Sequence, residues 1–196
     1  MLDIALIIGS VRPNRFADKA AEWVLRGAAE RSDFRLTTLD LRDIPLPFFN
    51  DPVSPAYAPV SSNPEGQAWR ETVARFDGYI MTVAEYNRGP TAVLKNALDW
   101  AYGEWNRKPV GFVGYGPLGA ARAVEQLRLN AVELQMVPTR TAVHIAMDAF
   151  MGAYMQGKTL DSFEFLNQPR SAVFDEVVWW GEATKAARAM LAKAAA

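Results

Sequence analysis

The chain has 196 residues, a length typical of one domain, and half of them are hydrophobic. Its formal net charge of −1 disfavours nucleic acid as a partner, because binding to phosphate backbones depends on clustered positive charge. The absence of cysteine excludes disulfides, thiolate nucleophiles and iron–sulfur clusters, and a single histidine disfavours a histidine-based metal site. An enzyme of this composition needs its reactive group from a cofactor, or from carboxylates, hydroxyls and lysines.

Neither a secretory leader nor a membrane span is predicted. The chain opens Met1-Leu2-Asp3 without a basic stretch, and its first apolar run stops at Gly9. No apolar stretch approaches the roughly 20 residues that cross a bilayer. We therefore expect a cytoplasmic protein, a single domain over 1–196, with no membrane partner.

Apolar runs and helical stripes alternate along the chain. Residues 2–8 are almost continuously apolar, which is typical of a strand covered on both faces. The second predicted strand, 34–41, alternates more and is expected nearer an edge. The other predicted strands are 79–83, 110–113 and one within 136–145, and the predicted helices cover 16–28, 64–76, 90–101, 124–134 and 171–194. This alternation predicts a doubly wound parallel sheet.

Residues 42–64 interrupt the alternation. The segment contains six prolines and shows no period. A connection of this length inside a compact domain is usually a functional lid or a partner-binding loop. Its aromatic residues Phe48, Phe49 and Tyr57 either cover a bound ring or pack within the loop or a subunit contact.

Loops that follow predicted strands are the expected place for a ligand, because ligands of open parallel sheets bind outside the carboxyl ends of the strands. The first such loop, Gly-Ser-Val-Arg-Pro-Asn-Arg at 9–15, leads directly into a predicted helix, whose unpaired N–H groups attract anions. Ser10 and Asn14 add neutral donors, and Arg12 and Arg15 add charge, which favours a phosphate group. The Gly-Lys-Ser/Thr ending of a Walker A motif is missing. The alternative is that Asn14 caps the helix and the arginines are solvated.

The second loop, Ala-Glu-Tyr-Asn-Arg-Gly-Pro at 84–90, combines a helix start with two groups suited to a flat ring. The Gly-Pro pair indicates a turn and the beginning of a helix. Tyr86 and Asn87 lie beside exposed backbone, where a heteroaromatic ring can be stacked and hydrogen-bonded. Lys95 and Asp99, in the helix that follows, are interpreted as surface or packing partners rather than acid–base groups.

The third loop, Gly-Tyr-Gly-Pro-Leu-Gly at 114–119, matches G-x-G-x-x-G. It follows the fourth predicted strand rather than the first, and 136–147 contains no carboxylate, so a dinucleotide fingerprint is disfavoured. A tight turn that lets a planar ligand approach the backbone is the better interpretation.

These sequences resemble the NAD(P)H-dependent FMN reductase family. The resemblance depends on Gly-Ser-x-Arg after the first strand, on Glu-Tyr-Asn…Pro…Leu-Lys-Asn-Ala-Leu-Asp-Trp after the third, and on Lys-Pro-Val running into Gly-Tyr-Gly at 108–116. The motifs fall within residues 2–145. The resemblance implies a flavodoxin-like three-layer α/β sandwich, with a five-stranded parallel sheet in the order 2-1-3-4-5 and helices on both faces.

The resemblance also implies which residues bind FMN. The FMN phosphate is assigned to Ser10, Arg12, Asn14, Arg15, Phe16 and Ala17. The isoalloxazine is assigned to Glu85, Tyr86, Asn87, Arg88 and Gly89, and its other flank to Gly114, Tyr115 and Gly116. Two positions depart from the family pattern: Ala84 replaces a common proline, and Asn14-Arg15-Phe16 replaces a serine-bearing loop, so the phosphate is expected to depend more on Arg15.

The predicted function is an FMN-dependent oxidoreductase with a ping-pong cycle. NADH or NADPH delivers hydride to the flavin N5, and a small acceptor (free flavin, quinone, azo compound or metal oxyanion) then takes the electrons. No side chain is expected to act as general acid, and no metal is expected. The alternatives are a non-enzymatic flavodoxin-like electron carrier and a flavin-free dinucleotide-binding protein. Arg88, Arg107 and Lys108 are candidates for a 2′-phosphate contact.

Two further features received structural interpretations. His144 is expected to be a satisfied structural residue rather than a catalytic one. Trp100, Tyr102 and Trp105 are more large aromatic side chains than a small surface helix needs, so we expect them to form an interface. The family resemblance also implies a homodimer or homotetramer.

Overall fold

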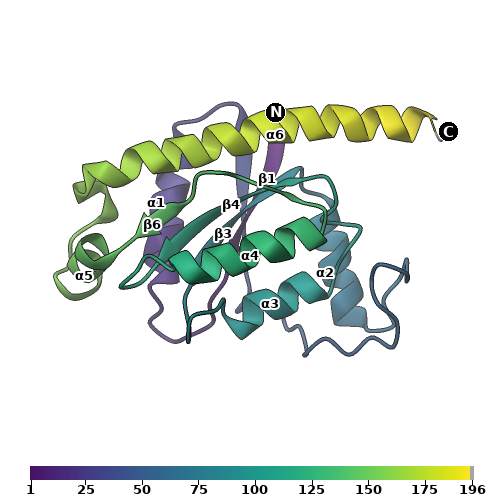
Figure 1. Cartoon of the computed structure of the whole chain (residues 1–196), viewed down its shortest axis with the longest axis horizontal. Coiled ribbons are helices and arrows are strands. Elements are labelled where there is room, and N and C mark those ends of the chain that lie inside the picture. The colour runs from purple at the N-terminus through teal and green to yellow at the C-terminus, as the bar shows by residue number, and fades with distance from the viewer. Residues whose placement is uncertain (195–196) are drawn as a thin grey trace.

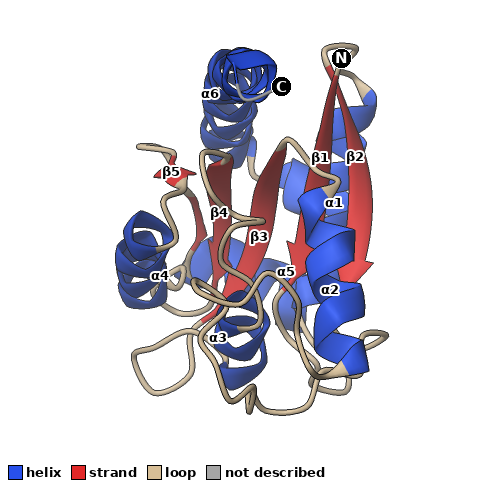
Figure 2. Cartoon of the chain, turned by 90° about the vertical axis from the view of Figure 1, so that its right-hand side faces the viewer, coloured by secondary structure: helices blue, strands red, loops and turns tan. Residues whose placement is uncertain are grey.

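Six strands form a parallel sheet, and helices cover both of its faces (Figures 1 and 2). The computed structural model describes residues 1–194. The strand order is β2-β1-β3-β4-β5, with β6 also paired to β4, which confirms the predicted flavodoxin-like order. The strands are β1 (Leu2–Ile8), β2 (Phe34–Asp40), β3 (Gly78–Ala84), β4 (Pro109–Tyr115), β5 (Val137–Pro138) and β6 (Val143–Ile145).

Two hydrophobic layers fill the space between the sheet and the helices. The even-numbered residues of β1 pack with α1, α5 and α6 on one face, and Ala5 and Ile7 pack with α2, α3 and α4 on the other. All residues of β3 and β4 are buried, as expected of strands covered on both sides. The helices are α1 (Ala17–Ala29), α2 (Pro64–Ala74), α3 (Ala92–Asp99), α4 (Ala121–Glu133), α5 (Met147–Met155) and α6 (Asn167–Ala194), and two 3-10 turns lie at Leu160–Ser162 and Glu164–Leu166.

The last predicted strand is split into β5 and β6. Both pieces pair with β4, and the Thr139 N–H still donates to the Val110 carbonyl oxygen at 2.9 Å, but residues 140–142 leave the ladder between them. Pro138 has no N–H for the sheet, and the Thr139 hydroxyl donates to the carbonyl oxygen of Thr141 at 2.8 Å. The strand position was therefore predicted and its interruption was not.

The carboxyl-terminal part of the chain differs most from the prediction. Helix α5 was not predicted, and α6 begins at Asn167 rather than near residue 171. Pro169 lies in the first turn of α6, where a missing N–H removes no helical hydrogen bond. Helix α6 runs along the top of the molecule in Figure 1 and packs on β4 through Val173 and Val177.

The expected interface role of Trp100 and Trp105 is wrong. Both side chains are fully buried in the layer beneath α2 and α3. Trp105 contacts Trp69 and Tyr79, with ring centroids 6.1 and 4.7 Å apart, and the Trp100 Nε1–H donates to the Pro47 carbonyl oxygen at 2.8 Å. These aromatic residues complete the core of the chain itself.

The irregular segment 42–63 is fastened to α3 rather than detached. The Asn96 side chain accepts from the Phe49 N–H and donates to the Pro47 carbonyl oxygen, each at 2.8 Å. Phe49 packs against Trp100, with ring centroids 5.1 Å apart, whereas Phe48 and Tyr57 are largely exposed. Of the uses predicted for these aromatic residues, packing of the loop is found for Phe49, which packs on the end of α3.

Candidate functional site

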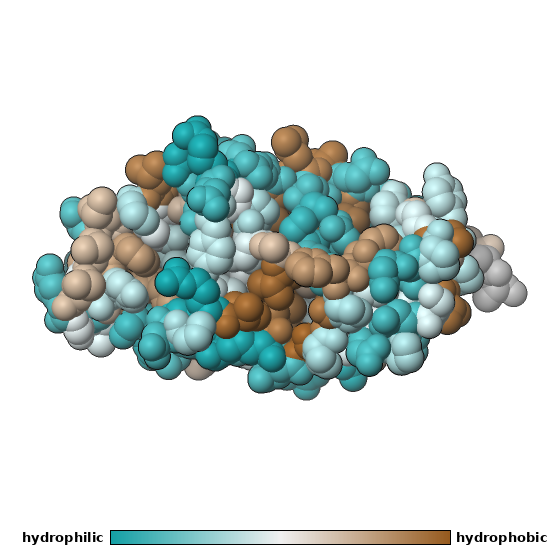
Figure 3. Space-filling view, turned by 90° about the horizontal axis from the view of Figure 1, so that it is seen from below, coloured by the Kyte–Doolittle hydropathy of each residue, from teal (hydrophilic) through white to brown (hydrophobic). Residues whose placement is uncertain are grey.

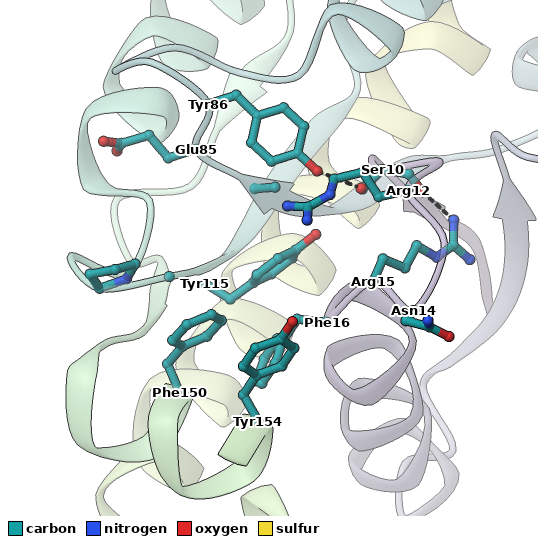
Figure 4. A pocket seen from close by; sticks show the side chains of 13 residues that line it. Ser10, Arg12, Asn14, Arg15, Phe16, Glu85, Tyr86, Tyr115, Phe150 and Tyr154 are labelled. Carbon is teal, nitrogen blue, oxygen red and sulfur yellow. Dashed lines mark hydrogen bonds between the residues drawn. The ribbon is translucent and has the colours of Figure 1, made fainter.

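The loops that follow β1, β3 and β4 meet at the carboxyl rim of the sheet, where the arrowheads of β1 and β2 point in Figure 2. A cavity of about 250 Å³ lies among them. Ser10, Arg12, Asn14, Arg15, Phe16, Ala84, Glu85, Tyr86, Tyr115, Gly116, Pro117, Phe150 and Tyr154 line it (Figure 4). The three sequence motifs that were predicted to act together therefore do meet at one site.

The first loop is packed tightly against the strand beside it. A Cβ at Gly9 would lie 2.4 Å from the Thr82 carbonyl oxygen, so only glycine fits at the end of β1. The Thr91 hydroxyl donates to the Gly9 carbonyl oxygen at 2.5 Å, and the Ser10 and Tyr86 hydroxyls are 3.0 Å apart. Thus the loops after β1 and β3 are joined directly across the cavity.

The two arginines of the first loop have different surroundings. Arg12 lines the cavity 5.8 Å from the centre of the Tyr86 ring and forms no ion pair with any residue in 1–194. The Arg15 guanidinium instead contacts Asp18, Asp40 and the Ser10 carbonyl oxygen, and Figure 4 shows it turned away from the centre of the cavity. All N–H groups of Arg15 are therefore used within the protein, and the structure does not support the expectation that the phosphate depends more on Arg15.

Helix α1 begins at the cavity without a side-chain cap. Its N-cap residue is Phe16, which offers no oxygen to the N–H groups of the first turn, and Asn14 has a positive φ of 52° rather than a capping position. Ala17 is fully buried at the first helical position and lies behind the cavity wall. The open N–H groups and the positive end of the helix dipole suit an anion.

Aromatic side chains form the wall opposite Arg12. Phe16 contacts Tyr115 and Phe150, with ring centroids 5.2 and 4.8 Å apart, and Phe150 stacks on Tyr154. The buried Tyr115 hydroxyl forms no hydrogen bond of ordinary geometry among residues 1–194, and the polar group beside it, the Ser10 hydroxyl, is bound to the Tyr86 hydroxyl. Burial raises the pKa of Tyr115, so this hydroxyl remains a neutral donor. Phe150 and Tyr154 were missed because the sequence after residue 147 matches no motif and α5 was not predicted.

The second loop is a tight turn between Tyr86 and Gly89. These two residues exchange backbone hydrogen bonds at 3.0 and 3.1 Å, and Asn87 and Arg88 between them have φ values of 52° and 72°. This is the pattern of a type I′ turn. The turn uses the N–H groups of Tyr86 and Gly89 internally, while Asn87 and Arg88 line a neighbouring cavity of about 300 Å³.

Glu85 has a structural role that its motif does not reveal. Its carboxylate accepts from the backbone N–H groups of Arg122 and Ala123 at the start of α4 and from the Arg122 guanidinium. Burial disfavours the carboxylate, but these hydrogen bonds outweigh it and lower the pKa of Glu85. The predicted contact between its side chain and the flavin ring is therefore unsupported, and only its backbone remains available.

The glycines of the third loop serve backbone geometry. A Cβ at Gly114 would lie 2.2 Å from the Gly119 carbonyl oxygen, so Gly114 supports the turn from beneath and lines neither cavity. Gly116 has a φ of 138° and open space around it, and it lines both cavities. His144 Nδ1 lies 2.8 Å from the Gly119 carbonyl oxygen, which fits its predicted structural role.

A larger apolar cavity of about 530 Å³ lies on the other side of Arg12 and Tyr86. Figure 3, which views the molecule from below and so faces this rim, shows hydrophobic side chains gathered near its middle. The Leu46–Phe48 part of the proline-containing segment and the start of α3 supply most of its lining. Arg12 and Tyr86 thus form a partition with a polar cavity on one side and an apolar cavity on the other.

Two predicted cationic residues lie elsewhere. Arg107 and Lys108 precede β4 at the amino end of the strands, opposite the cavities, and Lys108 is buried. The suggested 2′-phosphate contact is wrong for both. Among residues 1–194 no group of three or more acidic or histidine side chains is arranged for a metal ion, and no helix is long and apolar enough to cross a membrane.

The residues present fit FMN. Open N–H groups at α1 and Arg12, which has no ion pair in the described part of the chain, suit a phosphate. The buried Tyr115 hydroxyl forms no hydrogen bond with that part of the chain, and a polar ligand would give it one. The space at Gly116 admits a flat ring close to the backbone.

Comparisons with known proteins agree with this assignment. The family described as NADPH-dependent FMN reductase matches residues 2–149. An NAD(P)H-dependent FMN reductase of Nectria sp is 34% identical over 154 residues, which cover 74% of this chain and 77% of the relative. A 2-hydroxy-1,4-benzoquinone reductase of Burkholderia sp is 35% identical over 144 residues, covering 69% and 73%.

Solved structures show the same fold. The flavoenzyme NAD(P)H:(acceptor) oxidoreductase FerB of Paracoccus denitrificans superposes with a TM-score of 0.71 at 24% identity, covering 94% of this chain and 99% of FerB. The match in sequence over three quarters of the chain and the match in fold are consistent with each other. The chain belongs to the NADPH-dependent FMN reductase family of oxidoreductases, which use FMN as cofactor and NAD(P)H as electron donor.

Proposed function

We propose that the chain binds FMN across the rim cavities and uses NADH or NADPH to reduce a small acceptor, with a quinone as the foremost class. When bound, FMN would supply the redox chemistry, hydride transfer from the nicotinamide followed by two-electron reduction of the second substrate in a ping-pong order. The observation that carries the proposal is the buried Tyr115 hydroxyl, which forms no hydrogen bond within residues 1–194 and lies between an uncapped helix and an open glycine turn.

The chain's residues divide the work of holding FMN. Arg12, Ser10, Asn14 and the first N–H groups of α1 bind the phosphate, and the neutral Tyr115 hydroxyl donates to the ligand near them. The turn of Tyr86–Gly89 and the open backbone at Gly116 would hold the ring, and Asn87 and Arg88, which line the neighbouring cavity with Gly116, would contact it from there. The Phe150–Tyr154 pair excludes water from one wall.

No proton-transferring side chain is assigned. Glu85 is bound to the start of α4, and Lys95 and Asp99 form an ion pair at 2.7 Å on α3. The site therefore acts by positioning, which is the main requirement of a direct hydride transfer. This argues for an enzyme whose protein part orients two substrates in turn.

The apolar cavity beyond Arg12 and Tyr86 supports a quinone as the acceptor. Apolar side chains from residues 46–48 and the start of α3 dominate its lining, and Arg12 is its single cationic group. A ring with polar oxygens fits such a lining better than a metal oxyanion does. The Burkholderia relative is named as a benzoquinone reductase, which agrees with this class.

A homodimer or homotetramer is proposed on the basis of the exposed apolar side chains at this rim.

An anaerobic titration tests the proposal. The purified protein should bind FMN with a yellow absorbance band, and one equivalent of NADH or NADPH should bleach the band in a single two-electron step. A quinone added afterwards should restore the band without further nucleotide. An electron carrier would instead react sluggishly with the nucleotide, and a protein that gains no yellow colour with FMN would refute the proposal.

A further inference from the structure

The loop before α1 is attached to the edge of the sheet by a closed set of charged groups. Arg15 and Arg42 both contact Asp18, in the first turn of α1, and Asp40, the last residue of β2. Two cations therefore face two anions, and the set as a whole is neutral. Burial disfavours the Asp40 carboxylate, but hydrogen bonds from Arg15 and Arg42 outweigh it and lower the pKa of Asp40 to about 2.

Every N–H group of the Arg15 guanidinium has an acceptor within the protein. Nε and one Nη2 N–H donate to Asp18 at 2.8 and 2.6 Å, and Nη1 and Nη2 each donate to Asp40. The remaining Nη1 N–H donates to the Ser10 carbonyl oxygen. The side chain is 1% exposed. An anion in the cavity would have to break one of these buried charge-assisted bonds to reach Arg15.

The bond to Ser10 fixes the backbone of the loop. Because the peptide unit is planar and trans, a Ser10 carbonyl held toward Arg15 turns the Val11 N–H away from the guanidinium. Asp40 belongs to β2, whereas Asp18 belongs to the helix that the loop enters. The contact with Asp40 is therefore what ties the loop to the sheet. Arg12 shares none of these contacts and lines the cavity.

We infer that Arg15 is a positioning residue for the FMN phosphate and not a ligand of it. It neutralises Asp18 and Asp40 beside the site and holds residues 10–14 in the binding arrangement, while Arg12 supplies the positive charge. The inference rests on the FMN phosphate site proposed above. It also explains how this loop keeps an anion site although Asn14-Arg15-Phe16 replaces the serine-bearing loop that is common in the family.

Asp40→Asn distinguishes the two roles, because they require opposite changes. A phosphate-binding Arg15 would be freed by loss of the neighbouring negative charge, and FMN would bind more tightly. A positioning Arg15 loses its attachment to β2, so the FMN dissociation constant should rise about threefold to tenfold. The titration is done by flavin fluorescence in 0.5 M NaCl, which screens the general gain in positive charge. Riboflavin, which lacks the phosphate, should bind with unchanged affinity.

Matched variants complete the test. Arg42→Gln removes the other cation from the same carboxylates but no bond to the loop backbone, so the FMN dissociation constant should stay within about twofold. Asp40→Ala, which leaves no side-chain acceptor for Arg15 at the end of β2, should raise the FMN dissociation constant at least as much as Asp40→Asn. It replaces Asp40→Asn if that variant does not fold, as judged by the melting temperature without FMN.

Unchanged or tighter FMN binding by the two carboxylate variants overturns the inference. Arg12→Ala should raise the dissociation constant at least tenfold. Wild-type affinity in that variant would instead refute the proposed phosphate site, so the two failures are distinguishable.

Discussion

The Tyr115 hydroxyl has opposite effects on the stability of the free protein and on the affinity for FMN. Its hydroxyl is buried without a hydrogen-bond partner among residues 1–194, which costs the free protein stability. In Tyr115→Phe that cost disappears, so the free protein should be as stable as the wild type or up to about 2 kcal/mol more stable. The FMN dissociation constant should rise about threefold to tenfold. Urea unfolding without FMN and a flavin titration measure the two effects, and weaker unfolding stability together with unchanged binding would contradict this role.

Residue types were predicted well at this site, but their partners were not. The motifs placed Ser10, Arg12, Tyr86 and Gly116 at one cavity, where the structure also has them. The engagement of Arg15 by a carboxylate 25 positions away, and of Glu85 by a helix start 37 positions away, leaves no local pattern in the sequence. A motif specifies which groups are present, whereas the fold decides which of them are already satisfied.

At the scale of single elements, the stability of the turn at 86–89 depends on the backbone conformation of its two central residues. A type I′ turn needs positive φ at both central residues, a conformation that costs arginine more free energy than asparagine. Arg88→Gly should raise the free energy of unfolding by about 0.5–1 kcal/mol, and Asn87→Gly should change it less. Urea unfolding of both variants checks this. A loss of stability in Arg88→Gly would mean that the guanidinium, rather than the backbone, dominates this turn.

Lys108 caps the carbonyl end of α2 from the amino end of β4. Its ammonium donates to the Ala74 carbonyl oxygen and the Tyr79 hydroxyl at 3.0 and 3.2 Å, and burial lowers the pKa of Lys108 to about 8. An unfolded lysine has a pKa of about 10.4, so between these values the unfolded chain binds more protons and stability rises with pH.

The Lys108 linkage is tested by substitution. The unfolding free energy of the wild type relative to Lys108→Met should increase by about 3 kcal/mol between pH 7.5 and 10.5. Urea unfolding at several pH values measures this difference. Lys95→Met, on the exposed side of α3, is the matched control for loss of a lysine. A difference that stays constant with pH would rule out the linkage.

Elements with strong periods were predicted from the sequence, and those governed by distant contacts were not. Strands β1, β3 and β4 are buried on both faces and their sequences are apolar runs. Their positions in the chain and their parallel direction could therefore be predicted. The break between β5 and β6 depends on Pro138 and on contacts of residues 139–141. Helix α5 is apolar along most of its length and has no clear hydrophobic stripe, so the sequence pattern does not predict a helix there.

At the scale of the whole molecule, both hydrophobic layers depend on the same strands. Unfolding one layer would expose the other, so the proposed single domain should unfold in one calorimetric transition. FMN at 100 times its dissociation constant stabilises the folded state by about 2.7 kcal/mol, which should raise the melting temperature by about 5–10 °C. Two separate transitions would contradict the single domain.

The partition formed by Arg12 and Tyr86 links the two cavities thermodynamically. A ligand that shifts either side chain reshapes the space on the far side of the partition as well. Reciprocity then requires that if FMN alters the affinity for the occupant of the apolar cavity, that occupant alters the affinity for FMN by the same factor. Arg12 and Tyr86 therefore set how strongly the two ligands influence each other's affinity.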